Sequence, residues 1–175
     1  MKKIAEFYLR TLVPGAKFNS KKPVDDQALL FPDFLSKVKA CIQQYKLKHP
    51  AHDITFTETY RSNALQEIHF NNGASKIKKN GMHHYGISVD CIFIIGGKRT
   101  YKGDVTLIRK IYKDNGLTIL GAWDPLHVQF IPVADQPELR KAVSARITQF
   151  QKENGLAQTG EENAATIAKA KTVFA

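Results

Sequence analysis

The stretch 87–95, ISVDCIFII, constrains the fold of this 175-residue chain more than any other part of the sequence. It is nearly all apolar, which is typical of a strand buried on both faces of a sheet. Asp90 lies in its middle, and burying a carboxylate is costly unless a partner or a metal ion compensates its charge. Cys91 comes next and should point to the opposite side, into the core. The sequence therefore predicts a central strand that carries one acidic side chain to a site.

Shorter elements are predicted around this strand. The apolar spacing and the breakers indicate helices from Asp33 to before Pro50, from Ser62 to 72, over 103–114 and over 139–150, and strands over 53–61, 117–120 and 126–131. In the strand 53–61, the alternation places Ile54, Phe56, Glu58 and Tyr60 on one face. Residues 1–25 are expected to be irregular and 76–79 to be a loop. This pattern predicts an α+β fold, a small and mainly antiparallel sheet with helices packed on one side.

No apolar run is long enough for a membrane span. The start resembles the basic region of a signal peptide, but Glu6 and Arg10 interrupt the next residues and leave no apolar region there. We therefore expect synthesis without a signal peptide in a reducing cytoplasm, where Cys41 and Cys91 would be free thiols.

The chain is strongly basic. Lys and Arg number 26 against 16 Asp and Glu, a formal net charge of +10. Residues 1–52 hold 10 basic and 4 acidic residues, so more than half of the excess lies in the first third. Such a surface favours an anionic partner, which leaves nucleic acid, anionic lipid and bacterial envelope polymers open.

Two histidines accompany Asp90. His83 precedes it by seven residues, and His127 follows Asp124 by three. Two imidazoles and one carboxylate are the ligand set of a catalytic zinc site that keeps a position open. Asp124 would then be free to act as a general base, and Arg61 is a cation suited to stabilising an oxyanion. Taken singly, Asp90 fits a salt-bridge partner better than a zinc ligand, and His127 fits a half-buried strand histidine better.

The order of these residues resembles the M15 family of zinc peptidases, which includes D-alanyl-D-alanine carboxypeptidases, D-Ala-D-Ala dipeptidases and phage L-alanyl-D-glutamate endopeptidases. The resemblance covers about residues 53–131. Three family motifs are matched in order, by Tyr60-Arg61-Ser62 with Gln66, by His83, Gly86 and Asp90, and by Trp123, Asp124 and His127.

This resemblance implies that His83, Asp90 and His127 are zinc ligands in a cleft of a fold like that of DD-peptidases and hedgehog domains. It implies that Asp124 is the catalytic base and Arg61 the anchor for substrate and transition state.

The chain departs from the family pattern at two positions, where Ser88 replaces the usual Ala and Gly81 a common Ser. His84 adjoins the first ligand, but the spacing fits His83, so His84 is expected to face solvent or to lie behind the ligands.

We expect residues 1–137 to form the catalytic domain and 138–175 a helical C-terminal extension. The stretch 150–160 and the Ala-rich segment after it resemble half of a peptidoglycan-binding repeat. A plain helical cap on the catalytic domain fits equally well.

The predicted function is zinc-dependent cleavage of peptide bonds in bacterial peptidoglycan, as an endolysin-type L-alanyl-D-glutamate endopeptidase. A D-Ala-D-Ala carboxypeptidase is the alternative within the class. The expected partners are peptidoglycan peptide stems and anionic envelope polymers, with the protein a monomer that acts on the cell wall after synthesis in the cytoplasm (the host's, if phage-encoded). A non-catalytic, hedgehog-type zinc binder is the alternative of another class, and no recognition motif supports a nucleic-acid partner.

Overall fold

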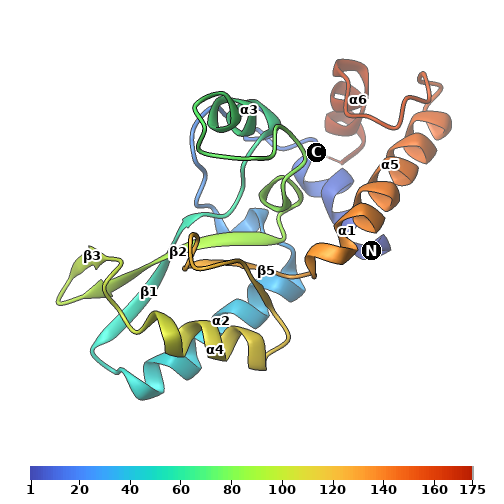
Figure 1. Ribbon diagram of the computed structural model, residues 1–175. Helices are drawn as coiled ribbons and strands as arrows, with labels where there is room; N and C mark the ends of the chain where they lie inside the picture. The colour runs from blue at the N-terminus through green and yellow to red at the C-terminus, as the bar shows by residue number, and fades with distance from the viewer. Residues whose placement is uncertain (175) are drawn as a thin grey trace.

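The apolar stretch forms β2 (Ser88–Ile95), the central strand of a five-stranded sheet in a computed structural model that describes residues 1–174 (Figure 1). The strand order is β1-β2-β5-β4, with β3 paired to β2 outside this path, and all pairings are antiparallel. The other strands are β1 (His52–Glu58), β3 (Lys98–Thr100), β4 (Thr118–Ile119) and β5 (His127–Gln129). The predicted α+β class is confirmed, although β4 and β5 are shorter than predicted and β3 was not predicted.

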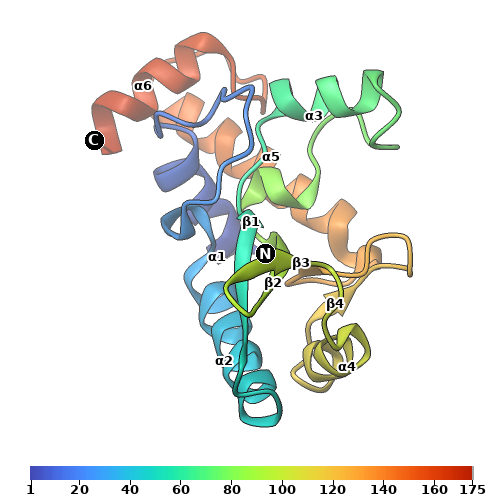
Figure 2. The same ribbon diagram turned by 90° about the vertical axis from the view of Figure 1, so that its left-hand side faces the viewer.

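Helices α2 (Pro32–Lys48) and α4 (Val105–Asp114) lie together on one side of the sheet (Figures 1 and 2). Alternate β2 side chains face them: the Phe93 ring lies 5.5 Å from that of Tyr45, and Cys91 Sγ lies 3.7 Å from the Tyr112 hydroxyl. Cys91 is thus in the core, as predicted, and Asp90 faces the other side of the sheet.

Helix α3 (Asn63–Asn71) lies on that other side, above the end of β1 (Figures 1 and 2). It begins where predicted, because the Ser62 side chain accepts a hydrogen bond from the Leu65 amide at 3.0 Å and so caps its first turn. The one-turn helix η3 (Met82–Tyr85) comes next and leads into β2 through Gly86. Gly86 has a φ of +65°, a left-handed conformation that favours glycine.

The prediction that residues 1–25 are irregular is wrong over the first half of that range. Helix α1 (Lys2–Phe7) continues into a π-helical segment, Tyr8–Leu12. Buried apolar residues recur there at helical spacing before the first breaker, Pro14. Helix α1 packs against α5 (Gln136–Glu153), and Glu6 pairs with Arg146 at 2.5 Å.

Helix α6 (Ala164–Phe174) comes after α5, so both predicted C-terminal helices are present. The proposed division into 1–137 and 138–175 stays a prediction. Cys41 and Cys91 are buried free thiols. No helix among residues 1–174 is long and apolar enough to cross a membrane.

A β-bulge decides which residue of β1 faces the site. From His52 to Phe56 the register with β2 is regular, but it shifts by one residue so that Glu58, not Thr57, lies opposite Asp90. Because directly opposed residues share a face, Glu58 leaves the core face of Phe56 and joins Asp90. The prediction that Glu58 shares a face with Ile54 and Phe56 is therefore wrong.

Candidate metal centre

Three side chains from separate elements converge on the face of the sheet opposite α2 and α4. His83 comes from η3, Asp90 from β2 and His127 from the start of β5, where it lies directly opposite Asp90. Asp90 Oδ1 lies 2.8 Å from His127 Nδ1 and 3.4 Å from His83 Nε2, and the two nitrogens are 3.3 Å apart. Both histidines are buried. The structure thus brings the three predicted ligands together.

The donor set fits a zinc ion. Zinc–ligand bonds of about 2.0–2.2 Å at tetrahedral angles place ligand atoms about 3.3–3.6 Å apart. Two of the three separations are 3.3 and 3.4 Å, and the third, at 2.8 Å, is an ordinary carboxylate–imidazole hydrogen bond. All three ligand atoms lie within 4.8 Å of one another, so a metal ion between them could contact each.

The electrostatics of Asp90 also favour a charged ligand. Burial acts to raise the pKa of this carboxyl, but the facing imidazoles of His83 and His127 outweigh it and hold the pKa well below its usual range. Asp90 is therefore an anion near neutral pH, as a metal ligand must be.

Asp124 lies beside the three ligands, in the turn between β4 and β5. Its Oδ2 is 3.7 Å from His127 Nδ1, and its side chain is 34% exposed. Partial burial raises the pKa of Asp124 above its usual value; the nearby Asp90 carboxylate adds to this, while His127 opposes it. A carboxylate so placed can exchange a proton with a molecule at the ligands.

Arg109 of α4 holds this turn, although no motif identified it. Its guanidinium donates to the carbonyl oxygens of Leu120 at 2.5 Å and Pro125 at 3.1 Å, on either side of Asp124. Trp123, in the same turn, is 78% exposed.

Arg61 lies on the same face, but the Glu58 carboxylate partly compensates its charge. Its Nε donates to Glu58 at 2.9 Å, Nη2 also pairs with Glu58 and lies 3.5 Å from Asp90, and Nη1 donates to Gln66 at 3.3 Å. These contacts use four of its five N–H groups, which leaves one on Nη1 without a partner among residues 1–174. Gln66, on helix α3, therefore helps to hold the Arg61 side chain in place.

Burial acts to lower the pKa of the Arg61 guanidinium, but hydrogen bonding and attraction to Glu58 outweigh it and raise that pKa. Glu58 is itself buried, and its Oε1 has no hydrogen-bond partner in the described residues. Sequence reasoning missed Glu58 because only the bulge brings it to the site.

His84 does not face solvent, so that part of the prediction is wrong. It is 2% exposed and points away from His83, into a polar cluster behind η3. Its Nε2 lies 2.6 Å from the Tyr8 hydroxyl and 3.7 Å from Glu162 Oε1. Tyr8 also donates to Glu162, so this acid from the C-terminal segment closes the cluster.

No protein-family model matches the sequence, and no curated protein matches it either. Among solved structures, the crystal structure of the L-Ala D-Glu endopeptidase ChiX from Serratia marcescens matches over 67% of this chain and 96% of that chain. The sequence identity is 19% and the TM-score 0.49, a likeness too weak to carry an argument about activity.

Proposed function

We propose that this protein is a zinc-dependent peptidase of the M15 type that cleaves peptide bonds in bacterial peptidoglycan. The observation that carries the proposal is the convergence of His83, Asp90 and His127 within hydrogen-bonding and metal-binding distances, with Asp124 3.7 Å from His127. Residues 44 positions apart supply these atoms, so no local motif forces them together.

His83, Asp90 and His127 would hold the metal ion. Zinc supplies Lewis acidity at such a site, polarising a peptide carbonyl and lowering the pKa of water. The three ligands are held by β2, β5 and η3, on the face of the sheet opposite α2 and α4.

Asp124 has the position of the general base. The ligand set already has its carboxylate in Asp90, so Asp124 is left to take a proton at Oδ2 and to return it to the leaving amine. Its raised pKa suits the first step, because a stronger base accepts a proton more readily. A non-catalytic binder has no use for this second acid.

Arg61 acts on the site mainly by its charge. One free N–H on Nη1 can donate to a substrate carbonyl or carboxylate, while Glu58 keeps the guanidinium in place. We therefore expect Arg61 to orient and steady the substrate, with a smaller effect than an unpaired arginine would have.

The preferred bond is L-Ala-D-Glu, with the terminal D-Ala-D-Ala bond as the second candidate. The charge of +10 favours an endolysin that is drawn to anionic envelope polymers. If so, the amount of protein that sediments with purified cell walls should fall as the salt concentration rises.

The test is digestion of purified peptidoglycan by the zinc-loaded protein, with the fragments identified by mass spectrometry. New alanine and glutamate termini would identify an endopeptidase, and released D-alanine a carboxypeptidase. Asp124→Asn should keep its fold and zinc but lose at least about 100-fold in rate, the low end of general acid–base contributions. Undiminished cleavage by this variant would refute the mechanism, and no cleavage by the parent protein would favour a binder.

A further inference from the structure

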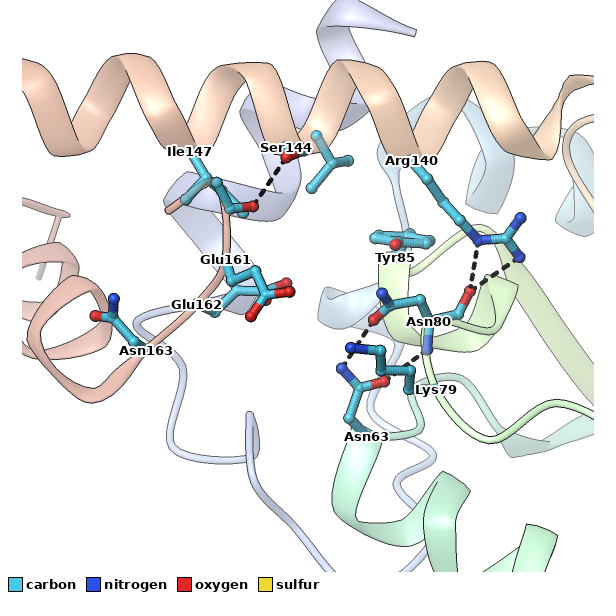
Figure 3. A pocket seen from close by; sticks show the side chains of 12 residues that line it. Asn63, Lys79, Asn80, Tyr85, Arg140, Ser144, Ile147, Glu161, Glu162 and Asn163 are labelled. Carbon is cyan, nitrogen blue, oxygen red and sulfur yellow. Dashed lines mark hydrogen bonds between the residues drawn. The ribbon is translucent and has the colours of Figure 1, made fainter. Parts of the chain in front are cut away.

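A polar pocket lies between η3 and the C-terminal segment, apart from the candidate metal centre. Its volume is about 370 Å³, within the range of roughly 300–1,000 Å³ typical of small-molecule sites. None of the metal ligands, Asp124 or Arg61 lines it. Tyr85 of η3, helix α5 and the loop before α6 form its walls (Figure 3).

The two sides of this pocket carry opposite charges. Lys79 and Asn80 face Glu161 and Glu162 across it, and Arg140 lies beyond Asn80 on the side of Lys79 (Figure 3). Among residues 1–174, Lys79, Arg140 and Glu161 take part in no ion pair within 4 Å. Arg140 donates to the Asn80 carbonyl through Nε and Nη2, and Nη2 also donates to Gln136 at 3.3 Å.

Tyr85 adds a hydroxyl to the wall of this pocket. The residue is 2% exposed as a whole, but its hydroxyl is open to the pocket and has no hydrogen-bond partner among the described residues. Figure 3 places Tyr85 between the acidic and basic sides, where its hydroxyl can donate to or accept from a bound molecule.

We propose that this pocket binds a zwitterion of dipeptide size, with its ammonium group at Glu161 and Glu162 and its carboxylate at Lys79 and Arg140. A purely anionic molecule would meet the two glutamates and a purely cationic one the two basic residues, and such like-charge contacts are unfavourable. The pocket is therefore selective for molecules that carry both charges.

The occupant would also contact the element that carries a metal ligand. η3 presents His83 to the metal centre and Tyr85 to the pocket. Peptides with free ends are what a peptidase of cell-wall stems releases. The biological meaning of the pocket, although not the binding itself, therefore rests on the proposed function.

Calorimetric titration with L-alanyl-L-alanine tests the site. The dipeptide should bind saturably below about 10 mM, whereas N-acetylated and C-amidated forms should bind at least about tenfold more weakly, since each lacks one charge. Binding should persist in a chelator, which separates this pocket from the metal centre. Absence of saturable binding, or equal binding of either capped form, would overturn the proposal.

Matched variants locate the binding. Tyr85→Phe, Lys79→Gln and Glu161→Gln should each weaken it by about 3- to 30-fold, as expected for the loss of one hydrogen bond or charged contact. Lys78→Gln and Glu153→Gln, which change residues outside the pocket, should leave it unchanged. Equal affinity in all five variants would show that the dipeptide binds elsewhere and would overturn the assignment. Because Tyr85→Phe removes only a hydroxyl and Glu161 is exposed, folding of these variants is readily checked by circular dichroism.

Discussion

The buried pair of Glu58 and Arg61 should dominate the stability of the site. Removing one member of a buried ion pair typically costs about 3–5 kcal/mol, because the other charge is left uncompensated. Arg61→Met leaves Glu58, 6% exposed, directly opposite Asp90, so two carboxylates face each other. We therefore expect a loss of about 4–5 kcal/mol in the free energy of unfolding.

Glu58→Gln should cost less, about 3 kcal/mol, because Arg61 keeps its contacts with Asp90 and Gln66 and its side chain is 18% exposed. The double variant should cost no more than Arg61→Met alone, so the sum of the two single costs should exceed the cost of the double variant by at least about 3 kcal/mol.

Urea denaturation followed by circular dichroism measures these values, in a chelator so that bound zinc does not add to stability. Glu67→Gln is the matched control, since Glu67 pairs with Lys78 at 3.1 Å on the exposed surface, and it should cost less than about 1 kcal/mol. If the costs of the two single variants add to within about 0.5 kcal/mol, the two residues are not coupled and the reasoning is wrong.

Three further outcomes are expected. Burial acts to raise the pKa of Glu162, but the nearby His84 imidazole and the hydrogen bond from Tyr8 outweigh it and lower that pKa. The stability that Glu162 contributes is therefore present above its unfolded pKa of about 4.3 and is lost as the pH falls through the folded value. In acid, the free energy of unfolding should therefore fall less steeply with decreasing pH for Glu162→Gln than for the parent protein. Elemental analysis should find zinc lost from His127→Ala and retained by His84→Ala, although the latter is destabilised because it opens the buried polar cluster. Gly86→Ala should lower the melting temperature and weaken zinc binding, since φ there is +65° and a Cβ would meet the Leu29 carbonyl oxygen; an unchanged melting temperature would contradict this.

The candidate site was predictable from sequence where it depends on local order. An acid inside an apolar strand predicted both the strand and its special side chain, because a buried carboxylate requires compensation. His83 and Asp90 lie in one short segment, a turn followed by a strand, and so do Asp124 and His127. Their spacing is therefore visible in the sequence. The pairing of β2 with β5 then places His127 opposite Asp90.

Tertiary structure alone decided the rest. The bulge that turns Glu58 toward Asp90 leaves no mark on the alternation of β1, because a one-residue shift moves a side chain to the opposite face without changing the sequence pattern. The enclosure of His84 depends on Tyr8 and Glu162, which lie 154 positions apart. Sequence periodicity reports which side of a segment is buried, whereas the partner across that buried side is determined only when distant segments pack together.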